Sequence, residues 1–174
     1  GYDKKGIHAI TMPCYGTTDR TLNNARRLME ILEVTSYEIN IKDACEQHYK
    51  DIGYDKSKLD VTFENVQARE RTQILMDVSN KIGSLVVGTG DLSELALGWC
   101  TYNGDQMSMY GVNASIPKTL VRGILESYAE HHEGLKDVLL DICDTPVSPE
   151  LLPPNEDGTI KQKTEDKIGS YVVH

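Results

Sequence analysis

The chain has 174 residues, which is within the range of one domain and enough to bury a substantial core. Its 27 acidic and 18 basic residues give a net charge of −9, so we exclude nucleic-acid or membrane partners that bind through a broad basic face. The four cysteines are widely spaced and form no Cys-x-x-Cys pair, which argues against a zinc site and favours a reduced, cytoplasmic setting. No apolar run approaches the length that crosses a membrane.

A strand-helix-strand unit is predicted at the start of the chain. Residues 6–12 are expected to form a strand that ends at Pro13, and Thr18 or Asp19 then caps a helix. The apolar face of this helix consists of Leu22, Ala25, Leu28, Met29 and Leu32. Residues 36–41 form the second strand. Because such a unit is normally parallel, we expect a parallel sheet.

A longer helix is predicted at residues 63–81, after a polar segment at residues 43–62 that contains a short helix around residues 45–49. The inward face of the long helix consists of Val66, Ile74, Leu75, Val78 and Ile82. Asn65 and Arg69 are four residues apart and therefore project from one helix face. Taken alone, this pair is typical of a solvated polar surface.

The next stretch carries most of the chemistry that the sequence indicates. Residues 85–87 are expected to form a buried strand that stops at Gly88-Thr89-Gly90, where glycines allow a tight turn and a close approach to a ligand. In an open α/β sheet, ligands bind at the carboxyl ends of the strands. The Thr89 hydroxyl and the backbone N–H groups beside it are therefore well placed for a nucleotide, although a Gly-Thr-Gly turn alone is a weak signal.

Two carboxylates follow this turn, and each has two interpretations. Glu94 and Asp105 are hard oxygen ligands, and Mg²⁺ usually takes one or two such groups beside phosphate oxygens and water. However, Asp91 and Glu94 also have the spacing of a capping box at a helix start, which spacing alone favours. Residues 103–105, Asn-Gly-Asp, are equally a good turn.

A helix at residues 119–130 is predicted next, with Lys118 in its first turn. Its apolar stripe consists of Leu120, Val121, Ile124, Leu125 and Tyr128. A cation at a helix start is disfavoured by the helix dipole unless an anion compensates. A short helix at residues 136–142 and a long proline-rich loop at residues 144–162 follow, within what we expect to be a single domain, residues 1–174.

The whole string from the Gly-Thr-Gly turn onward is far more specific than its parts. Residues 88–105 have the sequence Gly-Thr-Gly-Asp-Leu-Ser-Glu-Leu-Ala-Leu-Gly-Trp-Cys-Thr-Tyr-Asn-Gly-Asp, and residues 112–119 follow with Val-Asn-Ala-Ser-Ile-Pro-Lys-Thr. Together they closely resemble the synthetase domain of NAD synthetases, especially the glutamine-dependent branch. Three further segments agree and occur in family order, at residues 12–18, 65–71 and 162–171.

This resemblance implies an α/β, parallel-sheet, Rossmann-like fold of the adenine nucleotide alpha-hydrolase type, also called the pyrophosphate-loop synthetase fold. Family members carry an upstream strand and a Ser-Gly-Gly-x-Asp-Ser loop, which holds phosphates and helps to hold Mg²⁺, and nothing in this sequence matches it. The amidohydrolase domain that releases ammonia from glutamine is also missing. We therefore interpret the chain as a fragment truncated at both ends, lacking the first strand and phosphate loop, and expect it to be inactive alone.

The implied reaction of the parent enzyme is the ATP-dependent amidation of deamido-NAD to NAD. ATP adenylates the nicotinate carboxylate, and ammonia from the glutaminase domain then displaces AMP. By resemblance, Thr89 and Lys118 bind ATP, whereas Glu94 and Asp105 hold Mg²⁺ or lie at the edge of the substrate site. The residues that the resemblance assigns to deamido-NAD are Asn65, Arg69, Glu94, Trp99, Cys100, Thr101 and Tyr102. We also expect a homodimer with the helix at residues 63–81 at its interface.

Two other interpretations stay open. GMP and asparagine synthetases share the pyrophosphate-loop architecture, although the run at residues 88–105 argues against them. A non-catalytic nucleotide-binding module also fits a chain without the phosphate loop. For Trp99, stacking on the pyridine ring and packing in the core are both compatible with the sequence.

Overall fold

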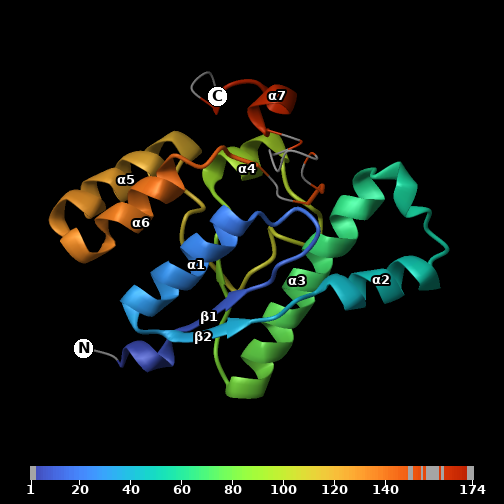
Figure 1. Ribbon diagram of the computed structural model, residues 1–174, viewed down its shortest axis with the longest axis horizontal. Helices are drawn as coiled ribbons and strands as arrows, with labels where there is room; N and C mark the ends of the chain where they lie inside the picture. The colour runs from blue at the N-terminus through green and yellow to red at the C-terminus, as the bar shows by residue number, and fades with distance from the viewer. Residues whose placement is uncertain (1–2, 149–150, 154, 156–160, 162, 172–174) are drawn as a thin grey trace. The chain divides into compact units, whose positions relative to one another are not determined.

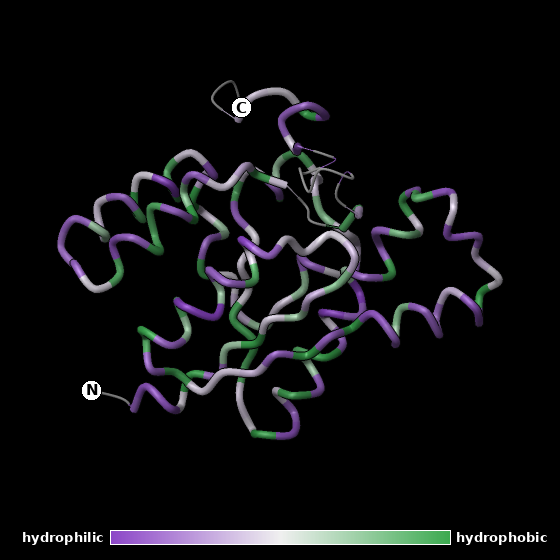
Figure 2. Tube along the Cα trace, viewed as in Figure 1, coloured by the Kyte–Doolittle hydropathy of each residue, from purple (hydrophilic) through white to green (hydrophobic). Residues whose placement is uncertain are grey.

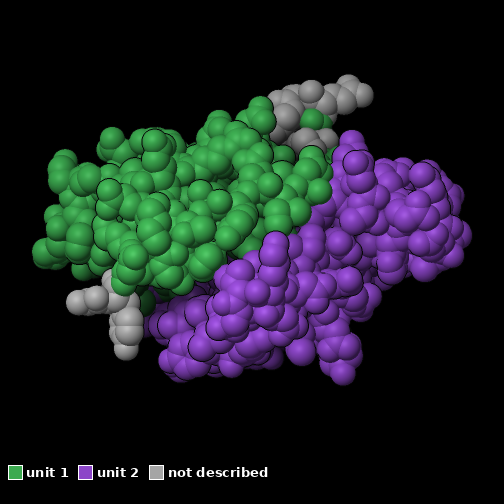
Figure 3. Space-filling view, turned by 90° about the horizontal axis from the view of Figure 1, so that it is seen from below, with its two compact units in different colours: residues 1–40, 121–169 green, residues 41–120, 170–174 purple. Residues whose placement is uncertain are grey.

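Residues 3–148, 151–153, 155, 161 and 163–171 are described by the computed structural model. The chain divides into two units, which Figure 3 colours separately. Unit 1 comprises residues 1–40 and 121–169, and unit 2 comprises residues 41–120 and 170–174. Each unit contains a pair of parallel strands flanked in sequence by helices, so the predicted α/β class with parallel strands is confirmed. The interpretation of residues 1–174 as one domain stays a prediction.

Unit 1 begins with the predicted strand-helix-strand unit (Figure 1). Strands β1 (His8–Thr11) and β2 (Thr35–Glu38) are parallel and joined by helix α1 (Asp19–Leu32). The Thr18 hydroxyl accepts a hydrogen bond from the Thr21 N–H and so caps α1, as predicted. Strand β2 is shorter than residues 36–41 because Ile41 instead marks the start of the next helix. A 3-10 helix, Lys4–Gly6, precedes β1.

Helices α5 (Lys118–His131) and α6 (Glu133–Cys143) complete the core of unit 1, where α6 packs against α1. The core cluster consists of buried Ala129, Leu135, Val138 and Leu139, with Leu28, Leu125 and Ile142 packed against them. Helix α6 is longer than the predicted residues 136–142. The stripe expected on α5 is only partly buried, because Leu120, Ile124 and Tyr128 are about half exposed.

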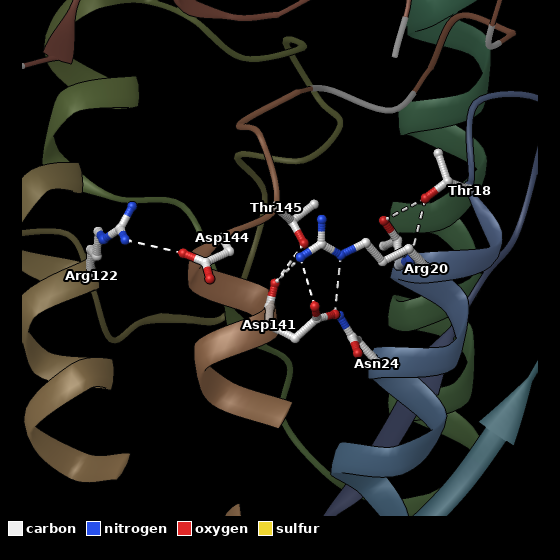
Figure 4. Close-up of polar contacts among 8 residues, drawn as sticks. Thr18, Arg20, Asn24, Arg122, Asp141, Asp144 and Thr145 are labelled. Carbon is white, nitrogen blue, oxygen red and sulfur yellow. Dashed lines mark hydrogen bonds and ion pairs between the residues drawn. The ribbon is translucent and has the colours of Figure 1, made fainter. Parts of the chain in front are cut away.

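A polar clamp joins α1 to α6 at the side of this core (Figure 4). The Arg20 guanidinium donates two hydrogen bonds to the Asp141 carboxylate, Nε to Oδ2 at 3.1 Å and Nη2 to Oδ1 at 2.6 Å. The buried Asn24 side chain donates to the same carboxylate at 2.5 Å. These donors, Arg20 foremost, lower the pKa of Asp141 below its ordinary value. The ion pair between Arg20 and Asp141 therefore joins α1 to α6 only while Asp141 is ionised.

Unit 2 starts with helices α2 (Lys42–Asp51) and α3 (Val61–Ile82), which pack against each other. Tyr49 and Phe63 are buried and stacked with ring centroids 5.5 Å apart, and the Tyr49 hydroxyl donates to the Phe63 carbonyl at 2.7 Å. Helix α2 is longer than the predicted residues 45–49, and the helical spacing of the buried residues Ile41, Cys45 and Tyr49 explains its extent. The Asp60 side chain caps α3 by accepting from the Thr62 N–H, and so α3 starts before residue 63.

The second strand pair lies in unit 2 and corrects one prediction. Strand β3 (Val87–Gly88) runs parallel to β4 (Tyr110–Gly111), which the sequence did not indicate. Residues 85–87 were expected to be buried throughout, but Leu85 and Val87 are 59% and 54% exposed, whereas Val86 is buried. Side chains of extended backbone alternate between two faces, and only the face of Val86 is covered. Thr89 does follow the carboxyl end of the strand, as predicted.

The remaining short elements are a 3-10 helix, Lys56–Lys58, and α4 (Leu92–Leu97) in unit 2, and α7 (Glu165–Ile168) in unit 1. In the predicted proline-rich loop, residues 144–148, 151–153, 155 and 161 are free of helix and strand beyond the end of α6, and the other residues of 144–162 lie outside the described residues. The Thr164 N–H donates to the Val147 carbonyl at 3.0 Å.

Hydropathy changes repeatedly along the longer helices of the described chain (Figure 2). Even α3, which has 22 residues, carries charged side chains such as Arg69 and Asp77. No helix in the described ranges is both long enough and apolar enough to cross a membrane.

The clamp yields a pH-dependent prediction for the variant Asp141→Asn. We expect lower thermal stability than wild type near neutral pH, because Asn cannot pair with Arg20 as a carboxylate does. A depressed pKa stabilises the fold above the unfolded pKa of about 4 and loses this effect as the pH falls through the folded value, so the two melting curves should converge in acid. The control Asp144→Asn should cost less, because Asp144 is 68% exposed and lies 3.4 Å from Arg122. Equal melting temperatures of wild type and Asp141→Asn at pH 7 contradict the prediction.

The second strand pair predicts that Gly88→Ala is destabilising. A Cβ at residue 88 would lie 2.3 Å from Ser108 Oγ and 2.6 Å from Ser108 Cβ. We expect a loss of about 1–3 kcal/mol in urea denaturation, the usual cost of overpacking. Gly90→Ala is the control, since its nearest atom would be Glu94 Oε2 at 3.7 Å. Adding Ser108→Gly should restore much of the loss, and no rescue would show that the clash is not the cause.

Candidate functional site

A pocket of about 280 Å³ lies in unit 2 at the carboxyl end of β3. It brings together the residues that the family resemblance assigns to ATP and to the metal, and two of those that it assigns to deamido-NAD, Glu94 and Cys100. These residues of the pocket wall are Thr89, Glu94, Cys100, Asp105 and Lys118. Of these, only Thr89 was predicted to lie at the end of this strand, and the individual roles of all five stay predictions.

Glycines shape the wall on the strand side. Gly88 and Gly90 flank Thr89 in the pocket lining, and Gly88 pairs with Gly111 of the neighbouring strand. The close approach of Ser108 to Gly88 leaves no room for a side chain there. The backbone beside Thr89 consequently faces the pocket without a Cβ to block it.

Lys118 is the central charge of the pocket. Its Nζ lies 2.7 Å from Asp91 Oδ2 and 2.8 Å from Glu94 Oε1, and its side chain is only 22% exposed. Burial by itself lowers the pKa of Lys118, but hydrogen bonds to Asp91 and Glu94 outweigh this effect, so the pKa is raised. The ammonium also lies 5.6 Å from the centre of the Tyr171 ring. Lys118 is therefore charged and held in one place.

Glu94 serves two structural contacts at once. Its Oε2 accepts from the Asp91 N–H at 3.1 Å, and the Asp91 side chain accepts from the Glu94 N–H at 3.1 Å, which confirms the predicted capping box of α4. Its Oε1 is the atom that contacts Lys118. Glu94 thus caps α4 and lines the pocket in a single conformation, and its interpretation as a metal ligand stays a prediction.

Asp105 closes the turn that forms another side of the pocket. Its carboxylate accepts from the Thr101 N–H at 2.6 Å, and the Gly104 N–H donates to the Thr101 carbonyl at 2.9 Å. Asn103 has a φ of 56°, a left-handed conformation that Asn tolerates. The predicted turn at residues 103–105 is therefore confirmed.

Cys100 lies on the pocket wall but is not set up as a nucleophile. Its thiol donates to Gln106 Oε1 at 3.0 Å. Burial, followed by the charges of Asp105 and Glu94, raises the pKa of Cys100. A thiol that stays protonated is a poor nucleophile.

Asn65 and Arg69 support the turn from helix α3. The Thr101 hydroxyl donates to Asn65 Oδ1 at 2.8 Å, and Arg69 Nε donates to the Tyr102 carbonyl at 3.1 Å. The pair therefore has a structural function and is not only a solvated surface. Of the seven residues assigned by resemblance to deamido-NAD, the described pocket wall includes Glu94 and Cys100. The other five are Asn65 and Arg69 on α3, Trp99 just after the end of α4, and Thr101 and Tyr102 directly before the turn.

Sequence reasoning did not pair Asp91 with Lys118. Asp91 appeared only as a helix cap, yet its side chain is 3% exposed and contacts the ammonium directly. A signal was available, because a lysine at the start of a helix requires a compensating anion. The missing information was which of the neighbouring carboxylates would supply it.

The donors in the pocket suit Mg²⁺ better than a metal held by protein alone. No group of three or more His, Cys, Asp or Glu converges within the described ranges. Glu94 and Asp105 both line the pocket, which matches the one or two carboxylates that Mg²⁺ takes when phosphate oxygens and water complete its shell. The residues present therefore fit this ion when a phosphate ligand accompanies it.

Comparison with known proteins places the chain in one family. The family model "NAD synthase" matches residues 2–151. The glutamine-dependent NAD(+) synthetase of Mycobacterium leprae (strain TN) is 44% identical over 182 residues, which cover 99% of this chain and 26% of that protein. The chain thus spans about a quarter of the length of this curated relative.

Solved structures agree with this result. The structure of glutamine-dependent NAD+ synthetase from Acinetobacter baumannii in complex with ADP has 29% identity and a TM-score of 0.71, covering 81% of this chain and 27% of that one. NMN synthetase from Francisella tularensis, at 23% identity and a TM-score of 0.76, covers 95% of this chain and 63% of that chain and shows the shared fold alone. The predicted Rossmann-like synthetase fold is therefore confirmed, and the chain belongs to the NAD synthase family.

Proposed function

We propose that the pocket beside β3 binds the phosphates of ATP and that the chain supplies part of the site at which deamido-NAD is amidated to NAD. The observation that carries this proposal is the charged, largely buried Lys118 ammonium at the carboxyl end of a parallel strand, beside Thr89. Family membership supports it. A relative of the same fold was solved with bound ADP, which is an adenine nucleotide of the expected kind.

The proposed reaction has two chemical steps. A nicotinate carboxylate oxygen of deamido-NAD attacks the α-phosphorus of ATP, and pyrophosphate leaves. Ammonia, supplied by glutamine hydrolysis in the whole enzyme, then attacks the acyl carbon, AMP leaves with the bond electrons, and the nitrogen loses a proton. The chain's main contribution is to orient two polyanions and to stabilise negative charge that develops on the α-phosphate.

Each pocket residue has a role in this proposal. Lys118 neutralises charge on the phosphates, and the Thr89 hydroxyl donates a hydrogen bond to them. Glu94 and Asp105 would hold Mg²⁺, which when bound supplies further charge neutralisation to the triphosphate. No covalent intermediate on the protein is needed, in agreement with the protonated state of Cys100.

We further assign deamido-NAD to the surface formed by α3 and the turn, with Glu94 and Cys100 at its pocket side. The Arg69 guanidinium suits a phosphate of the dinucleotide, and the Trp99 ring suits its pyridine. Asn65, Thr101 and Tyr102 would shape this surface through the hydrogen bonds described above. We also propose a cytoplasmic homodimer in which α3 contributes to the interface.

Nucleotide binding by this chain provides a direct test. We expect calorimetry to detect MgATP binding to the wild type and an affinity at least about tenfold lower for Lys118→Gln, because a charge-assisted contact to phosphate is lost. Lys81→Gln, an exposed change on α3 with the same loss of charge, is the control and should bind like wild type. Equal affinity of the wild type and Lys118→Gln would exclude Lys118 from the ATP site.

The metal and substrate carboxylates require the enzyme expressed from its complete gene. We expect Glu94→Gln to reduce NAD formation by roughly a hundredfold or more while the melting temperature changes little, because Gln still fits the capping box but lacks the charge. Asp105→Asn should behave alike, since an amide can keep the turn but binds a hard cation less well. Glu133→Gln, which removes an exposed carboxylate, is the control. Wild-type turnover in both site variants would restrict the pair to structural roles.

A further inference from the structure

Asp91 is the most deeply buried charge around the pocket, and both of its oxygens are engaged. Oδ1 accepts from the Glu94 N–H at 3.1 Å, and Oδ2 lies 2.7 Å from Lys118 Nζ. Its side chain is 3% exposed. A buried carboxylate is tolerated only when it is paired and hydrogen-bonded, so Asp91 and Lys118 depend on each other.

The position of Glu94 differs from that of Asp91. Glu94 lines the pocket and is 27% exposed, whereas Asp91 contacts Lys118 without belonging to the pocket wall. A cation or ligand that enters the pocket can therefore reach Glu94 and draw its Oε1 away from Lys118. Asp91 lies out of reach of such a ligand and can keep its contact.

The backbone around Lys118 is tied to the same helix start. The Lys118 N–H donates to Ser93 Oγ at 3.1 Å, and the Leu92 N–H donates to the Ile116 carbonyl at 3.0 Å. The first turn of α4 thus holds Lys118 by its main chain through Ser93 and by its ammonium through Asp91. Neither contact involves the Glu94 side chain.

We propose that Asp91 is the positioning residue of Lys118: it keeps the ammonium in place and neutralised when Glu94 turns to a metal ion or ligand in the pocket. Without Asp91, engagement of Glu94 would leave a largely buried ammonium without an anion, which is strongly unfavourable. The consequence for binding rests on the proposed function, whereas the hold on Lys118 is a property of the ligand-free chain.

The variant Asp91→Asn separates the positioning of Lys118 from the capping of α4. Asn is as good an N-cap residue as Asp, so α4 keeps its first turn while Lys118 loses one negative partner. Asp91→Ser serves as a second variant with the same logic if Asp91→Asn does not fold. Asp77→Asn, an exposed change on α3, matches the loss of charge and is the control.

The first measurement needs no nucleotide. The signal of the Lys118 ε-methylene, assigned by its absence in Lys118→Gln, reports side-chain mobility through its ¹³C relaxation. We expect a rigid Lys118 in the wild type, Asp77→Asn and Glu94→Gln, and a mobile one in the double variant Asp91→Asn/Glu94→Gln, which has neither carboxylate. A mobile Lys118 in Glu94→Gln, or a rigid one in the double variant, would overturn the proposal.

The second measurement is a double-mutant cycle for MgATP affinity. We expect Asp91→Asn to weaken binding about tenfold in the wild type and to cause no further loss in Lys118→Gln, because Asp91 acts through Lys118. Additive losses of MgATP affinity in the double variant would show that Asp91 does not act through Lys118. If the wild type binds no MgATP, the proposed function fails, while the relaxation experiment still decides whether Asp91 positions Lys118.

Discussion

The pocket depends on one electrostatic requirement, namely that a largely buried ammonium must be paired with anions. Lys118 meets this requirement through Asp91 and Glu94, both on the first turn of α4 or directly before it. Because the start of α5 carries the lysine, the two helix starts are joined by charge as well as by hydrogen bonds from the Lys118 N–H to Ser93 Oγ and from the Leu92 N–H to the Ile116 carbonyl. The carboxylates of Asp91 and Glu94 thus cap α4 and also neutralise Lys118.

Elements set by neighbouring residues were predictable from the sequence. The cap at Thr18, the capping box of Asp91 and Glu94 and the turn at residues 103–105 all rest on contacts within a few residues. The parallel pairing of β1 and β2 followed from the strand-helix-strand pattern. Helix lengths were less accurate because they depend on which residues are buried, as the spacing of Ile41 and its successors in α2 illustrates.

Contacts between distant residues could not be predicted in the same way. Arg20 and Asp141 are 121 positions apart, and no local pattern indicates that they meet. The same applies to Asp91 and Lys118, to the pairing of β3 with β4, and to the exposure of Leu85 and Val87, which depends on what covers each face. Family resemblance pointed to several residues that line the pocket, but only the geometry separated Asp91, which is not part of the pocket wall, from Glu94, which is.

The support that α3 gives to the turn has a consequence for divergence within the family. Arg69 binds the carbonyl of Tyr102, a group that every amino acid provides, while the Tyr102 side chain is 72% exposed. Residue 102 can therefore change without loosening the loop that carries it. Thr101 lacks this freedom, because its hydroxyl makes the contact to Asn65. The loop can accordingly vary its exposed surface at one position while the neighbouring residue maintains its shape.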